Sequence, residues 1–130
     1  MKGRTIAALQ VFLALFYVTL GLAKLMGIEV MVREFAAIGL GQWFRLATGA
    51  LEIAGGLALC VPAFAGFGAL LLACIMTGAA IAHLTVLDGS AAPAVALLAL
   101  NAAIAWYWLR DLGGELLEDS LDDDFRTLLR

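Results

Sequence analysis

Charged residues divide the chain into long apolar stretches that predict membrane-spanning helices. Residues 5–23, 53–87 and 89–109 contain no Asp, Glu, Lys or Arg. A crossing helix needs about 20 mostly apolar residues, so the first and last stretches each predict one crossing. The middle stretch of 35 residues would form a helix of about 52 Å, far longer than the roughly 30 Å hydrocarbon core. It must therefore contain a break.

The break is predicted at residues 62–68, where Pro62, Gly66 and Gly68 interrupt a sequence rich in Leu and Ala. The segment before it reaches spanning length only when Glu52 is included. The pattern therefore predicts an all-α integral membrane four-helix bundle with antiparallel neighbours. Its crossings are expected over residues 5–26, 44–61, 66–87 and 93–109. The alternative, with three crossings, leaves residues 53–61 as a short apolar stub, and we consider it the weaker interpretation.

The segment between the first two crossings carries apolar residues at helical spacing: Ile28, Met31, Val32 and Phe35. Glu29 and Arg33 form an i,i+4 pair on the opposite side. This pattern predicts a short helix in the membrane interface, and Trp43 beyond it suits the headgroup belt. Two roles stay open for this segment, a lipid-packed connector or a lid over whatever the bundle holds.

Composition agrees with a membrane protein, because 64% of the residues are hydrophobic, 15% are charged and the mean hydropathy is +1.00. A soluble domain of this size leaves too much surface in water to hide so many apolar side chains. The net charge of −3 divides unevenly, with −5 on residues 111–130 and +2 on residues 1–110. The chain lacks the basic face that nucleic-acid binding requires, so no nucleic-acid partner is expected.

The acidic tail, residues 111–130, is predicted to stand apart from a transmembrane domain formed by residues 1–110. After a helix break at Gly113 and Gly114, its apolar residues fall on one helical face: Leu117, Leu121, Phe125 and Leu128. The tail either docks on a partner through this face or is a solvated, partly disordered end.

Lys and Arg near the helix ends are used to predict orientation. Lys2 and Arg4 precede a run of spanning length, which favours an uncleaved signal anchor over a cleaved signal peptide. The counts near the helix ends on the two sides are equal. Because the first helix usually dominates and the tail adds Arg126 and Arg130, both termini are predicted to be cytoplasmic.

Polar residues within the predicted crossings are candidate site residues, because an ionised side chain at mid-bilayer costs about 2.5–3.5 kcal/mol or more. Counting along each helix predicts a polar layer near the midplane: Glu52, Asn101, Cys74, Thr77 and Tyr17. A second, cationic layer is expected nearer the outside: Lys24, His83 and Arg45. Such a layer above a buried carboxylate would attract anions or polar headgroups.

Each of these residues also has a structural interpretation. Lys24 and Arg45 are long enough to snorkel to the interface, and this is the favoured role for Arg45. His83 and Tyr17 suit helix packing, and hydrogen bonds between helices are the favoured role for Asn101 and Thr77. For Glu52 the structural alternative is an ion pair with Lys24.

Other chemistry finds no support in the sequence. Cys60 and Cys74 differ by about 9 Å in expected depth, too far for a disulfide. There is no C-x-x-C motif, and one histidine without a nearby cysteine pair predicts no metal or haem site. Phosphate-binding, dinucleotide-binding and nucleophile-elbow motifs are also missing.

The order and spacing of three short motifs resemble those of the DoxX / DoxX-like family of small bacterial membrane proteins. The motifs are GLAKL at residues 21–25, GALEIAGGLAL at 49–59 and MTGAAIAHL at 76–84. The resemblance covers about residues 5–109 and implies a four-helix bundle in the bacterial inner membrane. It also implies a link to quinone-dependent thiosulfate oxidation or to membrane complexes that handle oxidative stress. Lys24, Glu52 and His83 match the family's signature residues.

Two functional hypotheses follow. In the first, the chain is an accessory component of a membrane oxidoreductase system. It binds a quinone-like lipophile in a polar pocket, and Glu52 exchanges a proton with this ligand. The other ligand-binding candidates are Lys24, His83, Tyr17, Asn101, Thr77 and Arg45. No cofactor is encoded in the chain, so a bound quinone or a soluble or membrane oxidoreductase partner would carry the electrons. In the second, the chain is a scaffold that recruits a partner through the acidic tail. An oligomer is compatible with both hypotheses.

Overall fold

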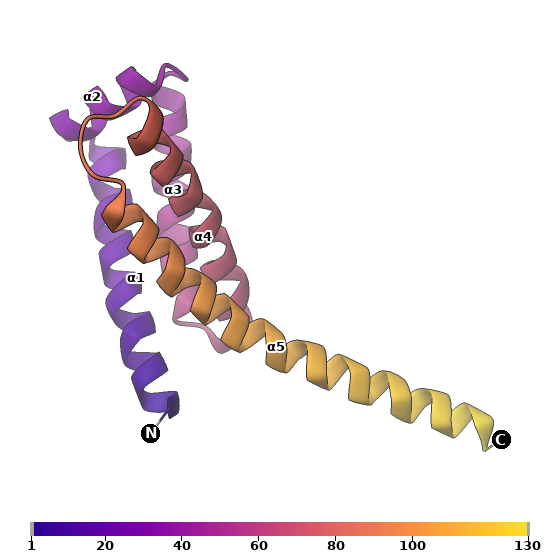
Figure 1. Cartoon of the computed structure of the whole chain (residues 1–130). Helices are drawn as coiled ribbons and strands as arrows, with labels where there is room; N and C mark the ends of the chain where they lie inside the picture. The colour runs from indigo at the N-terminus through magenta and orange to yellow at the C-terminus, as the bar shows by residue number, and fades with distance from the viewer. Residues whose placement is uncertain (1, 130) are drawn as a thin grey trace.

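The computed structural model describes residues 2–129, and it is entirely α-helical (Figure 1). The helices are α1 (Lys2–Met26), α2 (Glu29–Ile38), α3 (Gln42–Leu59), α4 (Pro62–Thr85) and α5 (Ala92–Leu128). Four of them, α1, α3, α4 and the first half of α5, run along one another as a bundle, and α2 lies across one end. The short helix predicted between the first two long helices is confirmed. Its place in a membrane interface stays a prediction.

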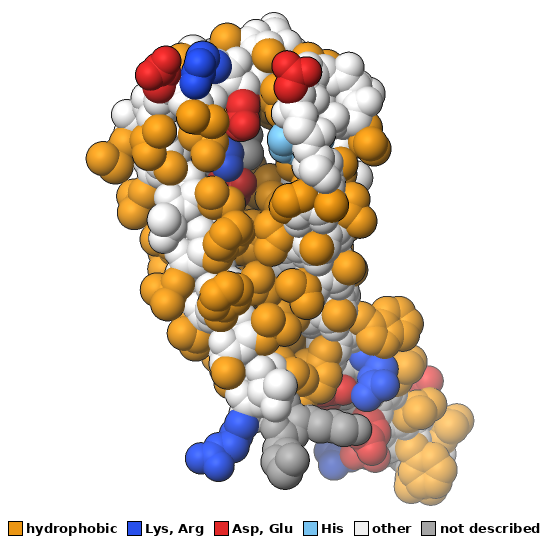
Figure 2. Space-filling model, turned by 60° about the vertical axis from the view of Figure 1, so that its left-hand side comes forward, with side chains coloured by type: hydrophobic (Ala, Val, Ile, Leu, Met, Phe, Trp, Pro, Cys, Tyr) orange, Lys and Arg blue, Asp and Glu red, His pale blue; other side chains and the backbone are white. Residues whose placement is uncertain are grey.

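Three helices, α1, α4 and α5, are long and apolar enough to cross a membrane. Helix α3 is not among them, because Gln42, Arg45 and Glu52 lower its hydropathy. It packs between α1 and α4, which are its main neighbours. Figure 2 shows hydrophobic side chains over the flank of the bundle and charged ones toward its two ends. The chain is therefore a membrane protein, and a crossing by α3 stays a prediction.

Two predicted helix boundaries are wrong. Helix α4 begins at Pro62 instead of residue 66, because proline fits the first turn of a helix, where its missing N–H is not needed. Helix α5 continues through Gly113 and Gly114 to Leu128, so the predicted break does not occur. A glycine inside a helix costs about 1 kcal/mol relative to alanine, which is too little to end a helix flanked by Leu and Glu.

The core of the bundle contains buried apolar side chains from all four long helices, including Leu13, Leu59, Leu72 and Ile104. Helices α1 and α3 approach most closely at Gly21 and Gly49, where a Cβ on Gly21 would lie 2.6 Å from the Gly49 carbonyl oxygen. This close approach brings the neighbouring turns of the two helices together, and they carry Lys24 and Glu52.

The two ends of the bundle differ. One end has α2, the connection at residues 39–41 and the segment between α4 and α5 (Figure 1). The other has the start of α1 and the turn at residues 60–61, and there α5 leaves the bundle. The N-terminus and the projecting part of α5 therefore lie at the same end, which agrees with termini on one side of a membrane. Which side that is stays a prediction.

Candidate ligand site at the α2 end of the bundle

A cavity of about 460 Å³ lies at the α2 end, with walls from all five helices. Its volume falls within the range of about 300–1,000 Å³ that is typical of small-molecule sites. Most of its side chains are apolar, and they include Phe16, Leu20, Phe35, Phe44 and Met76. Its polar wall residues are Lys24, Glu34, Thr48, His83 and Thr85. An apolar cavity with a few polar groups suits a lipophilic molecule with a polar head.

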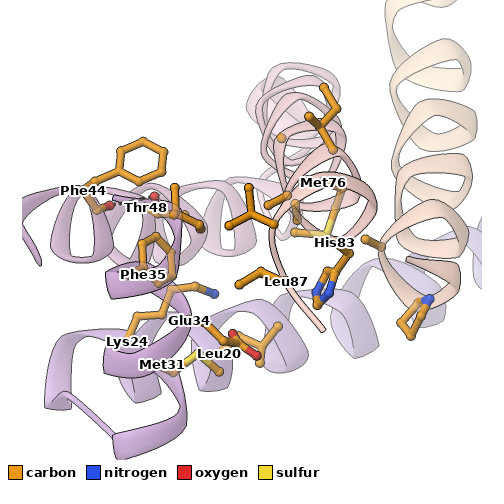
Figure 3. A pocket seen from close by; sticks show the side chains of 18 of the residues that line it. Leu20, Lys24, Met31, Glu34, Phe35, Phe44, Thr48, Met76, His83 and Leu87 are labelled. Atoms are coloured by element: carbon orange, nitrogen blue, oxygen red, sulfur yellow. Dashed lines mark hydrogen bonds between the residues drawn. The ribbon is translucent and has the colours of Figure 1, made fainter. Parts of the chain in front are cut away.

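Lys24 carries the positive charge of this cavity. Its ammonium nitrogen donates to both carboxylate oxygens of Glu52, at 2.9 Å to Oε1 and 2.7 Å to Oε2. Lys24 is only 8% exposed and Glu52 only 1%. Figure 3 shows the Lys24 nitrogen directed into the cavity. Because an ammonium group has three donors, one N–H is left for a ligand.

Glu52 lies behind Lys24 and is not part of the cavity wall. The ion pair that the sequence offered as the structural alternative is therefore present, and it is buried. A ligand in the cavity meets the ammonium group before it can meet the carboxylate. Removing one partner of such a pair leaves an uncompensated charge and costs about 3–5 kcal/mol.

His83 faces the same cavity from α4, opposite Lys24 (Figure 3). Its Nδ1 atom is buried and has no hydrogen-bond partner among residues 3–129. Buried polar atoms without a partner are uncommon in folded proteins, and each one needs an explanation. The hydroxyl groups of Thr48 and Thr85 each donate a hydrogen bond to a carbonyl oxygen of their own helix, at 2.8 Å. His83 therefore offers a free polar atom to a ligand.

Glu34, on α2, is a cavity residue that sequence reasoning missed. Its carboxylate has no ion pair or hydrogen bond within residues 3–129. The available signal was its position three residues after Met31 and next to Phe35, at the edge of the apolar face of the helix. Only the placement of α2 across the bundle turns that edge toward the cavity. Met31, Phe35 and Ile38 of α2 line the cavity as well, so the lid interpretation of this segment gains four wall residues.

Arg45 does not line the cavity and is not at the surface. Its guanidinium group donates to the Lys24 carbonyl oxygen, at the last turn of α1, and to the Gln42 side-chain oxygen at 2.7 Å. A cation at this position satisfies a terminal carbonyl group and complements the helix dipole. Arg45 therefore fixes the end of the helix that carries Lys24, and its predicted snorkelling to a membrane interface stays a prediction.

The predicted midplane residues separate into two groups. Tyr17 and Asn101 are fully buried, and the Asn101 amide nitrogen donates to the Tyr17 hydroxyl oxygen, joining α1 to α5. The same nitrogen donates to the Leu97 carbonyl oxygen at 2.8 Å, while the Asn101 side-chain oxygen has no partner among residues 3–129. The hydrogen bond between helices expected for Asn101 is thus present. Thr77 instead bonds the Ala73 carbonyl oxygen of its own helix at 2.9 Å.

Of the predicted ligand residues, only Lys24 and His83 therefore meet at the cavity. Tyr17 and Asn101 form a separate buried pair, and Thr77 has an exposed side chain. Cys60 and Cys74 are both free and exposed. Within residues 3–129, no group of three or more His, Cys, Asp or Glu side chains is placed to hold a metal ion.

Comparison with known proteins gives one match. The model of the DoxX-like family matches residues 8–107, a range that contains Lys24, Glu52 and His83 and leaves out the projecting part of α5. Searches of curated proteins and of solved structures found no match to the chain.

Proposed function

Because this chain belongs to the DoxX-like family and its apolar helices make it a membrane protein, we propose that it binds a quinone-like lipophile in the α2-end cavity. In this proposal it acts as an accessory component of a membrane oxidoreductase system. The observation that carries the proposal is that the Lys24 ammonium and the His83 imidazole face each other across a mostly apolar cavity.

Each polar group has a role in this proposal. The free N–H of Lys24 donates a hydrogen bond to a ring carbonyl oxygen of the ligand, and His83 bonds a second oxygen across the cavity. Glu34 accepts a hydrogen bond when the ligand carries a hydroxyl group, because a carboxylate has only acceptors to offer. The apolar wall, with Phe35 and Phe44, takes the ring and the start of the tail.

Proton exchange between Glu52 and the ligand passes through Lys24, because the carboxylate lies behind the ammonium group. Glu52 thus holds the Lys24 nitrogen in position between the carboxylate and the ligand. The pair is one proton-exchanging unit, and a ligand headgroup contacts its Lys24 side.

The membrane placement belongs to the same proposal. Helix α3 is the fourth crossing, because its 18 residues give a length of about 27 Å and its charged side chains are buried between helices. Helix α2 lies in the interface and covers the cavity. The host membrane is the bacterial inner membrane, with both termini in the cytoplasm.

The experiment is mass spectrometry, with an absorbance spectrum, of the protein extracted in mild detergent with its bound lipophiles. The test variants are Glu52→Gln and the charge-neutral double variant Lys24→Met/Glu52→Leu, which leaves no buried charge unpaired. Thr77→Val is the control, because Thr77 is polar and on α4 but lies outside the cavity. Wild type and control should retain a quinone-like molecule that Glu52→Gln and the double variant both lose. Equal retention by the double variant, or bulk lipid alone in the wild type, would contradict the proposal.

A second candidate function is a scaffold that recruits a partner through the α5 extension, residues 111–128. This segment is a continuous exposed helix that projects from the bundle (Figure 1). Its exposed apolar side chains include Leu117, Leu121, Phe125 and Leu128, and it also carries acidic residues. An apolar face with acidic neighbours suits an apolar groove with a basic rim.

Deleting residues 111–130 tests the scaffold function. The bundle should keep its thermal stability, because the extension contributes nothing to the buried core. A co-purifying partner should be lost with the deletion and also with Leu121→Glu, which places a charge on the apolar face. A partner that remains with both variants would contradict the scaffold role.

A further inference from the structure

A second cavity, of about 290 Å³, lies at the opposite end of the bundle, beside the start of α1. Its walls come from α1, the end of α3, the turn before α4 and the middle of α5. They are Gly3, Ile6, Ala7, Gln10, Val11, Leu59, Cys60, Pro62, Tyr107 and Trp108. None of these side chains is charged, in contrast to the α2-end cavity.

The wall residue Trp108 has one buried polar atom, its indole Nε1, without a hydrogen-bond partner among residues 3–129. Indole is a donor only, so the group that satisfies it must supply an acceptor. Buried Trp N–H groups usually find such a partner. The Gln10 amide nitrogen also lies in the wall, and it gives one of its two N–H groups to the Leu59 carbonyl oxygen at 3.0 Å.

The cavity lies at the depth where hydrocarbon meets headgroups. Arg110 is the first charged residue after the apolar stretch of α5, and it follows Trp108 by two residues, about 3 Å along the helix. On α1, Arg4 directly follows the wall residue Gly3. Trp and Tyr are enriched at this depth, and both types occur in the cavity wall.

We propose that this cavity binds a glycerophospholipid, with the start of one acyl chain against the apolar wall and its ester carbonyl accepting a hydrogen bond from Trp108 Nε1. The ester carbonyl is an acceptor with no proton to donate, and it lies at this boundary of the bilayer. The volume is just below the range of about 300–1,000 Å³ for whole small-molecule ligands, so the cavity takes one part of the lipid. The site is independent of the quinone-like ligand proposed for the other end.

The test uses two phosphatidylglycerols with the same headgroup and chain length, one with ester linkages and one with ether linkages, which lack the carbonyl oxygens. The full chain is reconstituted in vesicles containing equal amounts of both and extracted in mild detergent, and bound lipids are weighed by native mass spectrometry. The variant is Trp108→Phe, which removes the N–H and keeps an apolar ring. The control is Trp106→Phe on the same helix, because Trp106 is 72% exposed.

Wild type and Trp106→Phe should retain the ester lipid in preference to the ether lipid by about twofold to tenfold, the effect of one hydrogen bond. Trp108→Phe should lose this preference. Equal retention of both lipids by wild type, an unchanged preference in Trp108→Phe, or occupation by detergent or a quinone-like lipophile would overturn the proposal. Lys24→Met/Glu52→Leu should keep the preference, so failure of this site is distinguishable from failure of the α2-end site.

Discussion

The two ends of the bundle differ in buried charge, although each has a buried side-chain nitrogen without a partner among residues 3–129, His83 Nδ1 at the α2 end and Trp108 Nε1 at the other. At the α2 end, Lys24 is paired with Glu52, and Arg45 bonds the end of α1, so the charges are satisfied within the protein. At the N-terminal end, the Trp108 N–H has no partner from residues 3–129. At the α2 end, Glu52 and Arg45 thus hold the Lys24 charge in one place. The other end has an uncharged recess in which no group of residues 3–129 satisfies the Trp108 N–H.

The largest effect is expected from breaking the Lys24–Glu52 ion pair at the α2 end. Glu52→Leu leaves the Lys24 ammonium buried without its counter-charge, so the free energy of unfolding should fall by about 3–5 kcal/mol. The double variant Lys24→Met/Glu52→Leu should recover most of that loss, because no charge is then left unpaired. Thermal unfolding in lipid-free detergent micelles measures both. A double variant as unstable as Glu52→Leu would contradict the ion-pair explanation.

The next largest effect is expected at the close approach of α1 and α3, which brings Lys24 and Glu52 together. Gly21→Ala places a Cβ 2.6 Å from both the Gly49 carbonyl oxygen and Ile53 Cγ1. Such overpacking costs about 1–3 kcal/mol. Gly78→Ala is the matched control, because its Cβ would meet nothing within 4 Å, and it should gain up to about 1 kcal/mol from helix propensity. Similar unfolding temperatures for the two variants would argue against a tight α1–α3 contact.

A smaller effect is expected halfway between the two ends, where Tyr17 and Asn101 join α1 to α5. Tyr17→Phe removes the hydroxyl group and keeps the ring, so the free energy of unfolding should fall by about 0.5–1.5 kcal/mol. Thr77→Val should change it little, because the Thr77 hydroxyl bonds only its own helix. The same unfolding measurement applies, and a Tyr17→Phe protein as stable as wild type would show that this bond contributes nothing.

The smallest effect is expected at the N-terminal end. In lipid-free detergent micelles, Trp108→Phe should change the free energy of unfolding by no more than about 0.5 kcal/mol, because the N–H bonds no described part of the protein. A loss as large as that of Tyr17→Phe would reveal a partner within the chain. It would also remove the contrast between the two ends.

Much of the fold was predictable from local patterns. The apolar stretches between charges placed the long helices, and the spacing of Met31 and Phe35 placed α2, because both signals depend only on neighbouring residues. The two errors, at Pro62 and at Gly113–Gly114, arose where residues that usually interrupt helices were tolerated. Proline fits a first helical turn, and glycine inside a helix costs too little to end it.

Less of the site was predictable. Depth counting placed Lys24 and His83 near one level, and both line the cavity. It also grouped Arg45 with them, and Arg45 bonds the Lys24 backbone without lining the cavity. It grouped Thr77 with Glu52, but the Thr77 hydroxyl bonds a carbonyl oxygen of its own helix. Depth along a helix says how far a residue lies from the membrane surface, but not which neighbouring helix it faces.

The sequence by itself determined that this is a helical membrane protein, that Glu52 and Lys24 are costly to bury, and that the acidic charge belongs to the last twenty residues. Hydropathy and charge are properties of the residues themselves, so they can be read before the chain folds. Only the tertiary structure decided that Lys24 faces the cavity while Glu52 lies behind it, that α2 brings Glu34 to the wall, and that the Trp108 N–H has no partner among residues 3–129. These outcomes depend on helix rotation and on the Gly21–Gly49 contact, which bring together residues far apart in the sequence.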